Sequence, residues 1–196
     1  MSDSSPVSFQ ASTTETESQA ADSVTTPDPG VLLMAMAKAA TPGAPHRFLA
    51  EQVGTWNLAI KAWLDPNLPP TETTGTSERK MILGGRVMME QVESSFGGQP
   101  FHALALAGYD NVAGEFWGTW NDTSLTGITV SRGSYDEVTR TMTVAGSYWN
   151  PITESEIGVR TEIVHEGDRQ RMTAWELRGA EPMKAMEVIY SRVAGA

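Results

Sequence analysis

Gly54-Thr55-Trp56 follows a short helix-forming segment and lies at the head of an alternating run that extends from Val53 to Leu64. A glycine, one spacer and a tryptophan at the head of the first of many strands are typical of a small closed β-barrel. Side chains two residues apart share one face of a strand, which places Trp56, Leu58 and Ile60 together. We expect this apolar face to be the core side of the first strand.

Period-two alternation continues to the end of the chain. It divides into ten runs, at about residues 54–64, 71–83, 86–96, 101–109, 114–122, 127–135, 139–149, 156–166, 169–179 and 183–193. Turn-forming pairs such as Gly84-Gly85, Gly97-Gly98 and Asn150-Pro151 separate the runs. Gaps of hairpin length predict an antiparallel meander. We therefore predict an all-β barrel of about ten strands, because closure also removes exposed edge strands.

Two short helices are predicted ahead of the barrel. Residues 31–40 (VLLMAMAKAA) form a helix that Pro42-Gly43 stops, and residues 46–52 form a second helix that ends at Gly54. The first helix is apolar nearly all round, so we expect it to pack against another surface. A cap on its own domain is the favoured interpretation, and a partner surface is the alternative.

Residues 1–30 differ from the rest of the chain in composition. They hold twelve Ser or Thr residues, five acidic residues and no Lys or Arg. Such a segment cannot bury enough apolar surface to offset the entropy lost on ordering, so we predict a disordered acidic tail. The predicted organisation is a tail over 1–30, a short helix and linker over 31–45, and a barrel domain over 46–196.

Composition excludes several classes of protein. The net charge is −10, which argues against nucleic acid or an anionic membrane as a partner. The chain has no Cys, so it has neither a disulfide framework nor a thiolate metal site. No run reaches the roughly 20 apolar residues that span a membrane. The N-terminus also lacks the pattern of a signal peptide, so we expect a cytoplasmic location.

Candidate ligand-binding residues are aromatic, apolar, acidic or imidazole side chains along the predicted strands: Trp63, Met88, Glu90, His102, Trp117, Trp149, Trp175 and Glu187. An ionised carboxylate inside a barrel needs a partner or a raised pKa. The candidate partners are Arg86, Arg132, Arg160 and Arg178. The alternative interpretation is that these charges face solvent. A one-residue error in strand parity would move any of these side chains to the other face.

Motifs for metal or covalent chemistry are absent from the sequence. His46, His102 and His165 are far apart and form no metal-binding spacing, so no metal and no cofactor is predicted. His102 is the candidate axial ligand if a haem were bound, but a lone strand His is more often structural. A nucleophile elbow is also missing.

Several motifs together resemble a bacterial family catalogued as domain of unknown function 1579. They are the run His46-x-x-Leu49-x-x-x-Val53-Gly54-Thr55-Trp56, the pair Gly84-Gly85, and the segments Gly108-Tyr109-Asp110, Gly118-Thr119-Trp120 and Tyr190-Ser191-Arg192. The resemblance covers about residues 46–193 and implies a lipocalin-like, calycin-type barrel. It also implies that Arg192 covers Trp56 to close one barrel end, a contact of roughly 0.5–2 kcal/mol. It brings no catalytic residues.

The leading hypothesis is that the barrel binds a small, partly apolar or amphipathic molecule without covalent chemistry. One alternative is a cofactor-free isomerase, cyclase or hydrolase that uses a buried Glu with His102 as acid and base. Another is a structural or interaction protein that forms a homodimer through its apolar strand faces.

Overall fold

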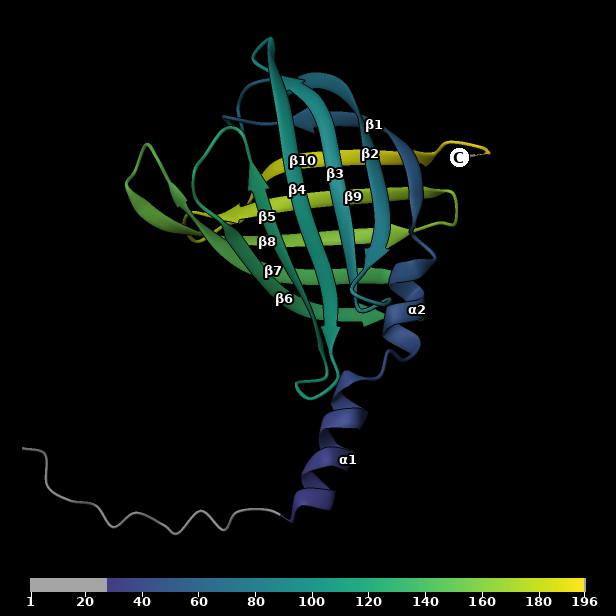
Figure 1. The fold of residues 1–196 in the computed structure, drawn as a ribbon. Coiled ribbons are helices and arrows are strands. Elements are labelled where there is room, and N and C mark those ends of the chain that lie inside the picture. Colours follow the sequence, from purple (N-terminus) through teal and green to yellow (C-terminus); the bar gives the residue numbers. More distant parts are fainter. Residues whose placement is uncertain (1–27, 196) are drawn as a thin grey trace, which may run out of the picture.

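The computed structural model describes residues 28–195 as two helices followed by ten strands (Figure 1). The helices are α1 (Pro29–Ala40) and α2 (Ala44–Ala50). The strands are β1 (Gly54–Ala62), β2 (Thr71–Ile82), β3 (Val87–Phe96), β4 (Gln99–Asp110), β5 (Glu115–Asp122), β6 (Thr129–Asp136), β7 (Thr141–Asn150), β8 (Ser155–His165), β9 (Arg169–Leu177) and β10 (Met183–Arg192). The tail predicted for residues 1–30 lies outside the described residues except at its last three positions.

The strands form one closed barrel. Each strand pairs antiparallel with the next in sequence, and β1 closes the barrel by pairing with β10. The closing register sets Trp56 opposite Arg192. The predicted all-β, antiparallel barrel of ten strands is therefore confirmed.

Turn chemistry explains where the strands end. Gly97 and Gly98 have φ values of 57° and 77°, and together they make the two-residue β3–β4 turn, which requires positive φ. Asp110 accepts hydrogen bonds from the backbone N–H groups of Val112 (2.8 Å) and Ala113 (3.1 Å) in the β4–β5 turn. β1 ends at Ala62, two residues before the predicted limit.

Helix α1 does not cap the domain, contrary to the prediction. Asp28 caps its N-terminus by accepting from Gly30 N–H (2.8 Å), but none of its residues is buried and Met34 is 76% exposed. Asn111 donates to the carbonyl of Ala39 (2.9 Å) and so ties down only the C-terminal end of the helix. α1 therefore projects from the barrel, as Figure 1 shows.

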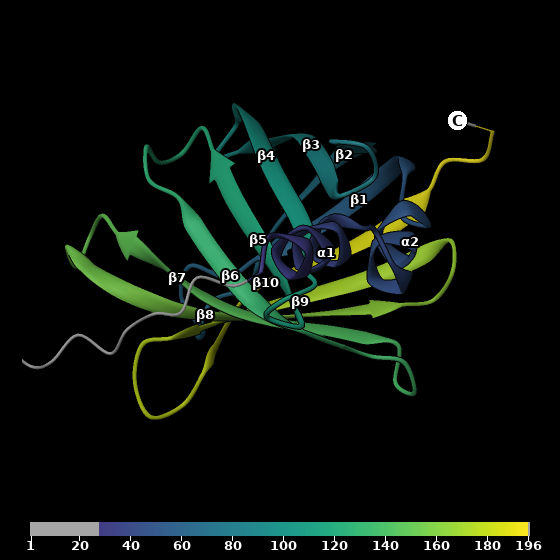
Figure 2. The ribbon, with the colours of Figure 1, turned by 60° about the horizontal axis from the view of Figure 1, so that its bottom comes forward.

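Helix α2 covers one end of the barrel. Figure 2 shows the helices in front of the strand ends, and α2 contacts β2, β3 and β4. Leu49 is buried, and Phe48 packs against the rings of Phe116 (6.0 Å) and Tyr135 (4.1 Å). Neither helix in the described part of the chain is long and apolar enough to cross a membrane.

The core has two apolar clusters. One, around Trp56, Leu58 and Val188, fills the middle of the barrel, and the other, around Leu49 and Phe116, lies under α2. Together they divide the interior into a half sealed by α2 and a half that no helix within residues 28–195 covers.

Candidate functional site

The two ends of the barrel differ in what closes them. We call the end under α2 the plug end; its strands are joined by turns at residues 83–86, 111–114, 137–140 and 166–168. We call the opposite end the open end; its connections are residues 63–70, 97–98, 123–128, 151–154 and 178–182. Inward-facing side chains alternate with outward-facing ones along every strand, so each strand contributes to both halves of the interior.

A buried polar network occupies the plug half of the interior. Arg79 Nη2 lies 3.0 Å from Glu90 Oε1, and Ser77 Oγ donates to the same carboxylate oxygen (2.6 Å). Arg79 Nη1 donates to Gln170 Oε1 (2.8 Å), and Gln170 Nε2 donates to Gln52 Oε1 (3.0 Å). Because these groups bond to one another, their buried charges and amides are largely satisfied without a ligand.

Two arginines flank the indole ring of Trp56. The guanidinium of Arg192 lies 4.2 Å from the ring centroid, and that of Arg79 lies 5.2 Å from it. Arg192 also donates to the carbonyls of Val53 (2.5 Å) and Glu51 (2.8 Å), so it ties the last strand to the end of α2. This arrangement is structural: cations and hydrogen bonds hold the plug in place.

Solvent reaches the inward-facing side chains of the open half. On β1, Trp56 and Leu58 are buried near the plug, whereas Ile60, further along the same face, is partly exposed. The same gradient runs along β10, from buried Tyr190 to partly exposed Met186. Partly exposed apolar side chains around this part of the interior are Ile60, Phe101, Trp120, Val159, Met172, Ala174 and Met186. The open half is therefore an accessible, mainly apolar surface.

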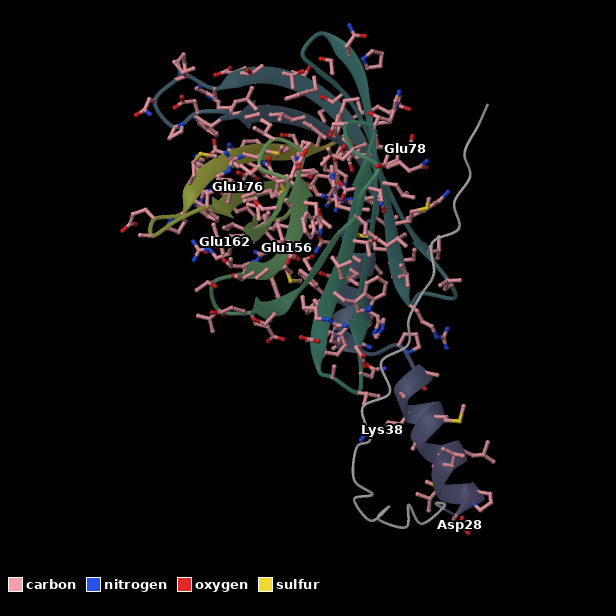
Figure 3. All side chains as sticks on the ribbon, turned by 90° about the vertical axis from the view of Figure 1, so that its left-hand side faces the viewer. Asp28, Lys38, Glu78, Glu156, Glu162 and Glu176 are labelled. Atoms are coloured by element: carbon pink, nitrogen blue, oxygen red, sulfur yellow. The ribbon has the colours of Figure 1, made fainter. Side chains whose placement is uncertain are left out.

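Polar side chains gather on one wall of the open half. Tyr148 Oη donates to Glu176 Oε1 (2.8 Å), and Asn150 Nδ2 donates to Tyr148 Oη (3.2 Å). The guanidinium of Arg178 pairs with the other oxygen of Glu176. Burial, and then the bond to Glu176, raises the pKa of Tyr148 above its usual value, so the phenol is neutral at pH 7. Figure 3 labels Glu176 on β9, and the labelled Glu156 and Glu162 of neighbouring β8 have the opposite strand parity and face outward.

Of the residues proposed from the sequence, two face the barrel interior. Met88 belongs to the apolar cluster under α2, and Glu90 is part of the buried network. Trp63 follows the end of β1, where its ring lies 4.6 Å from Lys184 Nζ.

The other five proposed residues lie on the outer face: His102, Trp117, Trp149, Trp175 and Glu187. Trp149 is 69% exposed, Trp175 packs against Arg160 (4.6 Å), and Glu187 is held by Lys184 (2.7 Å). The structure thus does not bring the eight residues together at one place.

Glu90 and His102 do not form the acid–base pair of the enzyme hypothesis. Glu90 faces the interior and is 8% exposed, whereas His102 is exposed on the outer face of β4. Within residues 28–195, no group of three or more His, Cys, Asp or Glu side chains is placed to hold a metal ion.

Sequence reasoning missed the residues that make the interior polar: Arg79, Tyr148, His165, Gln170 and Tyr190. Each shares strand parity with apolar inward-facing neighbours, such as His165 with Ile163 and Gln170 with Met172. Parity could have identified them. Arg79, which was not among the four arginines predicted as carboxylate partners, is the residue that pairs with Glu90.

The fold and the interior define a class: a closed ten-stranded antiparallel barrel with one plugged end and one solvent-accessible end. The chain belongs to the family described as "Protein of unknown function (DUF1579)", whose model matches residues 41–192. No curated protein matches the chain. Among solved structures it is similar to the crystal structure of Rv2717c from M. tuberculosis, with 13% identity and a TM-score of 0.60. That similarity covers 78% of this chain and 99% of the other, and it shows a shared fold alone.

Proposed function

We propose that this protein binds a small, partly apolar molecule without covalent chemistry, in the open half of the barrel interior. The observation that carries the proposal is the exposure gradient: Trp56 and Tyr190 are buried near the plug, while Ile60 and Met186 remain accessible. An accessible apolar surface in a concave setting gains free energy when a ligand removes it from water.

The side chains of the open half indicate what kind of molecule fits. Phe101, Trp120 and Met172 offer aromatic and thioether surface for an apolar body. Tyr148 and Glu176 on one wall offer a hydrogen-bonding pair for one polar group. An amphipathic ligand can place its apolar part against the core and its polar part at Glu176, so it makes apolar contacts and a hydrogen bond together.

Fluorescence of anilinonaphthalene sulfonate, which rises in apolar surroundings, tests the proposal. Ala174 faces the interior of the open half, so Ala174→Trp fills the space that the probe would occupy. Ala145 is exposed on the outer face of β7, so Ala145→Trp adds the same side chain without filling the interior. We expect Ala174→Trp to weaken probe binding at least about fivefold and Ala145→Trp to leave it unchanged.

The exposed apolar helix α1 is a competing site for this probe. Leu33 is 67% exposed, so Leu33→Gln is the control for binding to α1. Equal loss of binding in Leu33→Gln and Ala174→Trp, or no loss in Ala174→Trp, would contradict the proposal. Circular dichroism of each variant excludes unfolding as the cause.

Native mass spectrometry of protein purified from its own host would identify a retained molecule. The cytoplasmic location stays a prediction, which cell fractionation tests. The homodimer also stays a prediction, which light scattering tests.

A further inference from the structure

A separate cavity of about 250 Å³ lies at the plug end, between α2 and the ends of β6 to β10. Phe48 and Gln52 border it from the α2 side, and Tyr135, Arg140 and His165 border it from the barrel side. It faces away from the open half, and the buried network around Arg79 lies between the two. The cavity is therefore a second place where a ligand could bind.

Two side chains, Arg140 and Tyr135, bring unused hydrogen-bonding groups to this cavity, and the ring of His165 also borders it. His165 is 7% exposed, and its buried Nε2 atom has no hydrogen-bond partner. The guanidinium of Arg140 and the hydroxyl of Tyr135 form no hydrogen bond or ion pair with any group in residues 28–195. The Nε2 atom has almost no exposed surface, so the hydrogen-bonding groups that a ligand in the cavity can reach are those of Arg140 and Tyr135.

Glu51 adds an exposed carboxylate at the rim of the cavity, and the remaining polar side chains have partners. The amides of Gln52 and Gln170 bond to each other (3.0 Å), and Arg192 pairs with Asp168 (3.0 Å). Asp168 has an 87% exposed side chain and is neutralised by Arg192. Arg140, which is exposed, is thus the cation of this cavity that forms no ion pair within residues 28–195.

His165 adds an uncharged ring to the cavity wall. Burial, and then the charges of Arg79 and Arg140, lower the pKa of His165 to about 4. At pH 7 the imidazole is therefore neutral and brings no charge to the cavity.

Aromatic rings form the wall beside these donors. The ring of Phe48 lies 4.1 Å from that of Tyr135 at a tilt of 30°, and 5.1 Å from that of His165 in an edge-on arrangement. A planar apolar group can add to this cluster in offset or edge-to-face contact. The cavity thus combines donors for an anion with a surface for a ring.

We propose that this cavity binds the carboxylate of a small aromatic acid, which accepts hydrogen bonds from the Arg140 guanidinium and the Tyr135 hydroxyl while its ring packs against Phe48. The guanidinium fork suits two carboxylate oxygens, and a charge-assisted bond in a partly enclosed site is stronger than one in water. This site is independent of the ligand proposed for the open half.

Calorimetric titration with benzoate tests the proposal, with benzamide as the uncharged ligand of the same shape and acetate as the carboxylate without a ring. We expect benzoate to bind more tightly than both, and to shift the NMR resonances of the Gly167 and Gln170 amides at the cavity. Arg140→Gln should weaken benzoate binding at least about tenfold, as expected for loss of a charge-assisted hydrogen bond. Tyr135→Phe, which removes only the hydroxyl, should weaken it about threefold.

Arg171→Gln is the matched control, because Arg171 is exposed on the outer face of β9 and does not border the cavity. Unchanged binding in Arg171→Gln and in Ala174→Trp supports the assignment to the plug end. Equal affinity for benzoate and benzamide, equal losses in Arg140→Gln and Arg171→Gln, or no benzoate binding at about 10 mM would each overturn it. Loss of benzoate binding in Ala174→Trp would also overturn it, since the ligand would then lie in the open half.

Discussion

Arg79 and Glu90 form a buried ion pair across neighbouring strands, with Arg79 Nη2 3.0 Å from Glu90 Oε1. They are direct register partners on β2 and β3, and their side chains are 4% and 10% exposed. Burying two charges is costly unless further hydrogen bonds satisfy them. Ser77 supplies one such bond to Glu90 (2.6 Å), and Gln170 accepts one from Arg79 (2.8 Å). The pair therefore depends on both of its neighbours.

Breaking this pair from one side should be strongly destabilising. Glu90→Gln leaves the Arg79 guanidinium buried without a counter-charge, and we expect the free energy of unfolding to fall by about 3–5 kcal/mol. The double variant Arg79→Met/Glu90→Met should lose less than the sum of the losses in Arg79→Met and Glu90→Met, because it leaves no lone charge. Urea unfolding measures the stability of all four variants. Lys61→Met, which breaks an exposed pair with Glu72, should cost less than about 1 kcal/mol.

Trp56 should be the most costly tryptophan to remove. It is fully buried, and its ring lies 4.2 Å from the guanidinium of Arg192. We expect Trp56→Ala to lower the free energy of unfolding by about 3–5 kcal/mol, as for other large core deletions. Trp149→Ala, at a site 69% exposed, should change it by no more than about 0.5 kcal/mol. Similar losses in thermal or urea unfolding would show that Trp56 does not hold the plug.

Gly133 on β6 is required for the close approach of β7. A Cβ atom at this position would overlap the carbonyl oxygen of Thr143, and one at Gly146 would overlap that of Val130. We expect Gly133→Ala to cost about 1–3 kcal/mol, because the two strands would have to separate. Gly179→Ala is the control, since a Cβ there meets nothing within 4 Å. Equal unfolding midpoints for the two variants would refute the steric explanation.

The fold could be predicted from the sequence because the evidence for each strand and turn is local. Ten alternating runs and their turn residues are each readable within about a dozen positions, and Gly97-Gly98 requires the turn that it forms. The contact between Trp56 and Arg192 was instead implied by the family resemblance, and the two residues are register partners on the strands that close the barrel. Helix α1 was misjudged because apolar composition indicates a need for burial, not what provides it.

The site could not be read in the same way. Both faces of β5 are aromatic, so alternation there does not tell the interior from the outside, and Trp117 was placed among lining residues although it faces out. The interior network joins residues that are distant in sequence: Gln52 bonds to Gln170, and Arg79 bonds to the same amide. Only the closed barrel brings these groups together, and no spacing rule relates them.

Acid should destabilise the protein through His165. Its pKa is lowered to about 4 in the folded state, against 6.5 in an unfolded chain, because burial and nearby arginines disfavour the imidazolium. Below pH 6.5 the unfolded state binds a proton that the folded state does not, so the free energy of unfolding falls as the pH drops. The contribution is fully present above pH 6.5, decreases down to pH 4, and amounts to about 3 kcal/mol.

Urea unfolding of the wild type and of His165→Gln at pH 7, 5.5 and 4 measures this contribution. We expect the stability of the wild type to fall more steeply over this range than that of His165→Gln, which has no proton to bind. His102→Gln, at an exposed position on the outer face of β4, is the control for the substitution itself. His46, whose pKa is also lowered by burial, is present in all three proteins and cancels from the comparison. Parallel slopes for the wild type and His165→Gln would mean that His165 titrates normally and is therefore not enclosed beneath α2.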